Sequence, residues 1–203
     1  TLPLGAAGPA TLPAWTPERL ALQEPVKEVL AQQKIARRRY GDVGVEARSR
    51  MGYNPHERPL STLQNLGSVI NTAVSAYGQD VLLLYADDPG ALRALYRSIT
   101  DLMLLCLRTF PAVDGEPLST VFVGNCTVAM IGPRQYADVN AEFDRELAGF
   151  ARSIGARFLV HQDSDVTPHL AGYARLGVVH GLDVGQDTDF DSAVRLFPRT
   201  SAN

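Results

Sequence analysis

The sequence predicts an α/β fold of the (β/α)8 TIM-barrel type, and three observations lead to this prediction. Between residues 119 and 198, short apolar runs alternate with longer amphipathic segments, which is typical of βαβ units around a parallel sheet. Each apolar run ends in polar residues, and ligands bind at the carboxyl ends of strands in such folds. The 203 residues contain only about four predicted strands, so the chain is either part of an incomplete barrel or a smaller open sheet.

A single domain is expected over residues 1–203, beginning with an arm of loop character at 1–15, where Gly, Pro and Ala predominate. Thr16 and Pro17 are typical of a helix start, and a helix is expected over 16–39, ending before Gly41. Alternating residues at 42–48 predict a strand, and the Pro- and Gly-containing segment that follows predicts a long loop. Helices are then expected at 60–77, 80–85 and 88–108.

The helix expected at 88–108 opens with Asp-Pro and carries an apolar stripe, which predicts that one of its faces is buried. The stripe consists of Leu92, Leu95, Tyr96, Ile99, Leu102 and Met103. Strands follow at 121–123, 156–160 and 178–182, each succeeded by a helix, at 133–154, 167–176 and 188–196. Because crossovers between parallel strands are right-handed and short, we expect these three strands to be adjacent and parallel in sequence order.

Composition excludes several classes of function. The net charge of −3 and the pI of about 5.8 provide no basic excess for a phosphate backbone, so nucleic acid is not expected as a partner. No apolar run approaches the roughly 18 residues that span a membrane, and the first residues lack the basic region of a signal peptide. Cys106 and Cys126 are the only cysteines. Cys106 lies in an apolar run and Cys126 at a strand end, so a disulfide between them is not expected, and without CxxC spacing neither is a thiolate zinc cluster. These features predict a cytoplasmic protein.

Spacings along much of the chain are similar to those of a known family. The segment GSVINTAVSAYGQDVLLLYADDPGALRALYRSIT contains a glycine-led helix, a second glycine, a short acidic-apolar helix and an Asp-Pro pair that opens the next helix. VFVGNCTVAMIGPRQY combines a strand, a polar turn, Gly-Pro and an aromatic residue, and FLVHQDSD and GLDVG end the next two strands. In these features residues 60–198 resemble the uroporphyrinogen decarboxylase superfamily.

The resemblance implies a (β/α)8 barrel and one of two reactions. One branch of the superfamily decarboxylates a tetrapyrrole without a cofactor, and the other transfers methyl groups with a corrinoid and a zinc ion bound by His-x-Cys and a later Cys. His161 matches that histidine, but Asp163 stands at the cysteine position and no later cysteine follows. Asp163 and Asp183 fit the decarboxylase pattern better, although the arginine-rich substrate loop of decarboxylases has no counterpart before residue 59.

Three residues are candidates for catalysis. His161 and Asp163 lie two apart at a strand end, so an extended backbone would place both side chains on one side. They could act as an acid with its orienting carboxylate or bind a divalent metal, whereas the ordinary alternative is a histidine satisfied by hydrogen bonds. Asp183 ends the next apolar run, where it could contact substrate or cap the following loop.

Three further residues are candidates for substrate binding. Asn125 and Cys126 follow the strand at 121–123 and could contact a ligand, although a small cysteine is often simply packed. Arg58 on the long loop could hold a substrate carboxylate, although a loop arginine is more often solvated. We expect Asn125 to face the same cavity as His161 and Asp183.

By resemblance, the favoured reaction is decarboxylation of a tetrapyrrole-like polycarboxylate. Asp183 or Asp163 would stabilise a pyrrole-like cation and His161 would move protons, with no cofactor required. The first alternative is methyl transfer, with zinc held by His161 and Asp163 if a metal binds at all, and with a corrinoid protein as partner. The second alternative is a non-catalytic ligand-binding relative. A small-molecule ligand is expected in each case, and a homodimer is left open.

Overall fold

The computed structural model describes residues 63–114, 118–198 and 201–202, together with residues 18, 19, 22–24, 27, 28 and 31. The arm expected at 1–15, the strand expected at 42–48 and the candidate Arg58 lie outside the described residues. Of the helix expected at 16–39, only isolated residues are described.

Five parallel strands form one sheet in the described part of the chain. They are β1 (Leu63–Gly67), β2 (Thr120–Gly124), β3 (Arg157–Gln162), β4 (Gly181–Val184) and β5 (Ser201–Ala202). The strands lie in sequence order, and each neighbouring pair is parallel. This order does not reverse, as it would in a doubly wound sheet, and is compatible with the wall of a barrel. The predicted adjacency of the three central strands is confirmed. The sheet formed by the described residues is compatible with part of a barrel, and these residues do not show a closed one.

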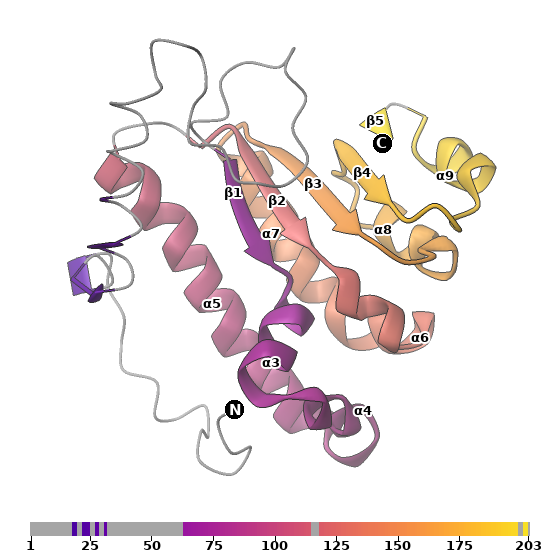
Figure 1. Ribbon diagram of the computed structural model, residues 1–203, viewed down its shortest axis with the longest axis horizontal. Coiled ribbons are helices and arrows are strands. Elements are labelled where there is room, and N and C mark those ends of the chain that lie inside the picture. The colour runs from indigo at the N-terminus through magenta and orange to yellow at the C-terminus, as the bar shows by residue number, and fades with distance from the viewer. Residues whose placement is uncertain are drawn as a thin grey trace.

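Helical segments connect the strands. Between β1 and β2 the chain forms α3 (Val69–Tyr77), η3 (Gln79–Leu83), α4 (Leu84–Asp87) and α5 (Pro89–Asp114). Between β2 and β3 it forms η4 (Cys126–Met130), α6 (Pro133–Gln135), the π-helical turn η5 (Tyr136–Asn140) and α7 (Ala141–Ser153). The segments η6 (Thr167–His169) and α8 (Leu170–Ala174) precede β4, and α9 (Phe190–Leu196) follows it. Figure 1 shows α7 behind the sheet, α5 to the left of β1 and α3 beyond the carboxyl end of β1.

The helix expected at 60–77 is wrong in its first half, which is strand β1. The helical part begins only after Ser68, whose side-chain oxygen accepts a hydrogen bond from the backbone nitrogen of Asn71 at 3.2 Å. This bond satisfies one of the free N–H groups in the first turn, so Ser68 is the N-cap of α3. The strand was missed because the sequence LQNLG lacks the β-branched and aromatic residues that mark strands.

The stripe on α5 is buried at four of its predicted positions, Leu92, Tyr96, Ile99 and Met103. Leu102 is 40% exposed, which contradicts its place in the predicted core. The buried residues follow the spacing of one helix face, and Leu102 is turned away from that face by most of a quarter turn. No described helix combines the length and the apolar character that crossing a membrane would need.

Candidate functional site

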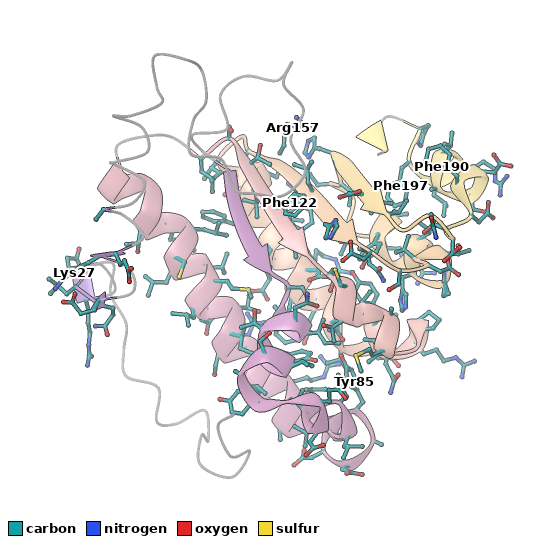
Figure 2. All side chains as sticks on the ribbon, viewed as in Figure 1. Lys27, Tyr85, Phe122, Arg157, Phe190 and Phe197 are labelled. Atoms are coloured by element: carbon teal, nitrogen blue, oxygen red, sulfur yellow. The ribbon has the colours of Figure 1, made fainter. Side chains whose placement is uncertain are left out.

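One face of the sheet carries a row of residues at its carboxyl edge. Gly124 on β2 is the register partner of His161 on β3, and His161 is the partner of Asp183 on β4. Because Gly124 has no side chain, the imidazole of His161 has space on its β2 side. Phe122, which is labelled in Figure 2, lies two residues before Gly124 on β2. Its ring stacks against this imidazole with ring centroids 5.8 Å apart and an interplanar angle of 26°. The strand register therefore fixes the position of the imidazole from both sides.

The imidazole of His161 lies between two carboxylates. Its Nδ1 is hydrogen-bonded to Oδ2 of Asp183 at 2.6 Å, and its Nε2 lies 2.8 Å from Oδ1 of Asp163. The side chain of His161 is 13% exposed, compared with 70% for Asp163. Although Nε2 is close to Asp163, it is buried and makes no aligned hydrogen bond. Nε2 therefore lies close to the carboxylate of Asp163 but forms no hydrogen bond with it.

Cys126 completes a group of three ligand types at this edge. It is the first residue of η4, directly after the turn that ends β2, and its Sγ lies 3.2 Å from Oδ2 of Asp163. The ligand atoms of Cys126, His161 and Asp163 all lie within 4.8 Å of one another. Burial raises the pKa of the Cys126 thiol, and the negative charge of Asp163 adds to this effect. A cation between the three groups would reverse that effect of charge, because it favours the thiolate.

Two backbone contacts hold the loops that carry these residues. The backbone nitrogen of Thr127 donates to Oδ1 of Asn71 at 2.9 Å, which ties the start of η4 to α3. Gly185, just after β4, lies against the backbone of Asp163, and a Cβ at this position would stand 2.2 Å from the carbonyl oxygen of Asp163. Only glycine permits this approach, so the loop after β4 fixes the loop that presents Asp163.

Asn125 does not lie with His161 and Asp183, which corrects the expectation of a shared cavity. It follows Gly124, and successive side chains of a strand point to opposite faces. Its side chain is 1% exposed, and its Nδ2 donates to Tyr173 at 2.9 Å and to Asp144 at 3.2 Å. Of the predicted site residues, the structure therefore brings together His161, Asp163, Asp183 and Cys126.

Sequence reasoning missed a buried carboxylate behind the sheet. Asp144 on α7 is 4% exposed, and burial raises its pKa to about 6. Its Oδ2 accepts hydrogen bonds from Tyr136 at 2.8 Å and from Asn125. A signal was present, because Asp144 shares a helix face with the buried residues Leu147, Ala148 and Ala151.

Comparisons with known proteins show similarity in fold. No family model matches the sequence, and no curated protein matches it. A solved structure of a methyltransferase from Methanosarcina mazei is similar, with a TM-score of 0.66 and 13% sequence identity. The similarity covers 94% of this chain and 51% of that chain, so this chain spans about half the length of that methyltransferase. At this identity the likeness shows that the chain has the same kind of α/β fold.

Proposed function

We propose that this chain transfers methyl groups at a divalent metal centre formed by Cys126, His161 and Asp163. The single observation that carries the proposal is the convergence of a thiol, an imidazole and a carboxylate within 4.8 Å at the carboxyl edge of a parallel sheet. The fold likeness to a methyltransferase supports methyl transfer over decarboxylation, which needs no metal. The sequence predicted only His161 and Asp163 as possible metal ligands. Cys126 adds a thiol to these two ligands.

The residues fit zinc. Thiolate, imidazole and carboxylate are the three ligand types that zinc accepts, and a site with three protein ligands leaves a fourth position for substrate. The buried Nε2 of His161, which has no aligned hydrogen bond, is free to ligate. Asp183 holds Nδ1 at 2.6 Å, and an Nδ1–H that donates to this carboxylate would leave Nε2 to bind the metal. When bound, zinc would supply Lewis acidity that lowers the pKa of a thiol substrate.

In the proposed reaction a corrinoid would supply the methyl group, and a thiol substrate at the metal centre would accept it. The chain's own residues orient and shield this step. Asp183 fixes the imidazole of His161, and Phe122 covers one face of that ring. The acceptor thiol would approach from the side of Asp163, whose side chain is the most exposed of the three ligands.

The test is a methyl-transfer assay with methylcobalamin, a small thiol and Zn²⁺. We expect S-methyl product from the wild-type chain, and a loss of at least about tenfold in Asp183→Asn, because the partner that orients a ligating histidine is removed. Asp187→Asn removes an exposed carboxylate from the loop after β4 and is the matched control. Carbon dioxide release from a polycarboxylated tetrapyrrole without added metal would instead support decarboxylation. Tight ligand binding without turnover would support the non-catalytic alternative.

A further inference from the structure

A polar network lies between the sheet and its helices, on the face opposite His161. It consists of Asn125, Tyr136, Asp144 and Tyr173, each no more than 4% exposed. Oδ2 of Asp144 accepts from the hydroxyl of Tyr136 and from Nδ2 of Asn125, and Nδ2 also donates to the hydroxyl of Tyr173 at 2.9 Å. Four elements meet in this network: the end of β2, η5, α7 and α8.

A gain in folding stability does not by itself explain such a buried polar network. A buried carboxylate loses its hydration, and well-packed apolar residues in its place are often at least as stabilising. The residues around the network are also tightly packed. A Cβ added to Gly172 of α8 would lie only 2.7 Å from the ring of Tyr136. A buried carboxylate oxygen that accepts hydrogen bonds from two partners does, however, fix the orientation of those partners.

Asn125 connects this network to the metal centre. Its backbone nitrogen donates to the carbonyl oxygen of His161 at 2.7 Å, which ties the end of β2 to β3. Its side chain is held from behind by Asp144 and Tyr173. The next residue is Cys126, whose Sγ lies 3.2 Å from Asp163. The direction in which the chain leaves β2, and so the position of the thiol, depends on how Asn125 is held.

We propose that Asp144 is a positioning residue that acts through Asn125 to hold the Cys126 thiol beside His161 and Asp163. The inference rests on the metal centre of the proposed function and adds a buried residue outside it. Partners of this kind, which orient a ligand without touching the metal, typically change metal affinity by about 10- to 100-fold when they are removed.

Co²⁺ titration tests this role, because a thiolate ligand gives Co²⁺ a charge-transfer absorption band. The background is Cys106→Ser, so that Cys126 is the only thiol. Asp144→Asn keeps the size of the side chain but removes the negative charge that strengthens the two hydrogen bonds accepted by Oδ2. We expect a weaker band and Co²⁺ affinity lowered by about tenfold or more. Leu147→Ala, also buried on α7, is the control that lowers stability without changing the band.

A swap of the two side chains provides the rescue. In the double variant Asn125→Asp with Asp144→Asn, donor and acceptor exchange places. The hydroxyl of Tyr173 can then donate to the carboxylate at position 125, and the hydroxyl of Tyr136 can donate to the amide oxygen at position 144. We expect Co²⁺ affinity and the band to return most of the way to wild type. A role in folding stability alone would not predict changes in the absorption band of the folded protein. Wild-type affinity and band in Asp144→Asn would overturn the inference.

A readout without metal separates this inference from the proposed function. Alkylation of Cys126 by iodoacetamide reports the position of the thiol, which is partly buried beside Asp163. The parent is the Cys106→Ser background. We expect Cys126 to be alkylated several-fold faster in Asp144→Asn than in this parent, and at the parent's rate in Leu147→Ala. If the parent binds no Co²⁺, the metal centre is wrong, and the alkylation rates alone decide whether Asp144 positions the thiol. Equal rates in parent and Asp144→Asn would then refute it.

Discussion

Residues of this site could be predicted from the sequence where they directly follow an apolar run. His161, Asp163 and Asp183 follow apolar runs, so the sequence placed them at strand ends. The partnership of Cys126 with Asp163 spans 37 residues and depends on β2 pairing with β3 in one register. The direction of the Asn125 side chain was predicted wrongly, because it depends on which residue of β2 is the register partner of His161. That partner is Gly124, the residue before Asn125. A shift of register by one residue exchanges the two faces of a strand.

Asp144 gives the stability of the protein a dependence on pH. Its pKa is about 6 in the folded protein, compared with an ordinary value of 3.8, because the carboxylate is buried. Between these values the folded state keeps a proton that the unfolded state has lost, so stability falls as pH rises from about 4 to 6. Tyr136 and Tyr173 stay protonated throughout, because burial raises their pKa values further.

Asp144→Asn should remove this dependence. A pKa difference of about 2 corresponds to roughly 3 kcal/mol, so the free energy of unfolding of wild type should fall by up to that amount relative to the variant between pH 4 and pH 7. Denaturant titrations of both proteins at several pH values measure the difference. Curves that run parallel over this range would show that Asp144 is not the buried acid described.

Gly185→Ala tests the close approach of the two loops at the site. A Cβ at this position would meet the backbone of Asp163 at 2.2 Å, so one of the two loops must move. We expect a loss of roughly 1–3 kcal/mol in stability, as for overpacking elsewhere, together with weaker binding of Zn²⁺. Gly149→Ala is the control, because a Cβ added there would meet no atom within 4 Å outside its chain neighbours and the backbone of its own helix, and alanine favours helix α7. Equal stability of the two variants would argue against the contact.

At the scale of elements, the sequence predicted those whose apolar period is clear. The strands at 121–123 and 156–160 correspond to β2 and β3, and the strand at 178–182 is displaced to Gly181–Val184. The long helix at 133–154 contains the π-helical turn η5, which turns Tyr136 and Asn140 inward and which no local pattern marks. β1 was missed because only its pairing with β2 distinguishes it from the start of a helix.

Helix α5 offers a test of its buried face. Leu92 is fully buried, so Leu92→Ala should cost roughly 2–5 kcal/mol in the free energy of unfolding. Leu102 is 40% exposed, so Leu102→Ala should cost less than about 1 kcal/mol. Denaturant titration of the two variants compares them directly. Similar costs for both would place Leu102 in the core and refute the described orientation of α5.

At the scale of the whole molecule, the parallel sheet in sequence order is what makes a shared site from distant segments. The order followed from the alternation of strands and helices, because short right-handed crossovers place successive strands side by side. Closure of a barrel did not follow, since it depends on strands beyond the five described. Residues after β2, at the end of β3 and on β4 meet at one edge because the carboxyl ends of all three strands lie there.

The zinc content of the purified protein at neutral pH tests the metal centre most directly. Wild type and Cys126→Ser would be dialysed against micromolar Zn²⁺, and bound metal measured by elemental analysis. We expect one equivalent of zinc in wild type, no zinc in His161→Ala and strongly reduced zinc in Cys126→Ser, whereas the control Cys106→Ser should bind zinc like wild type. Wild type without bound zinc, or zinc that persists in His161→Ala, would contradict the metal centre and with it the case for methyl transfer.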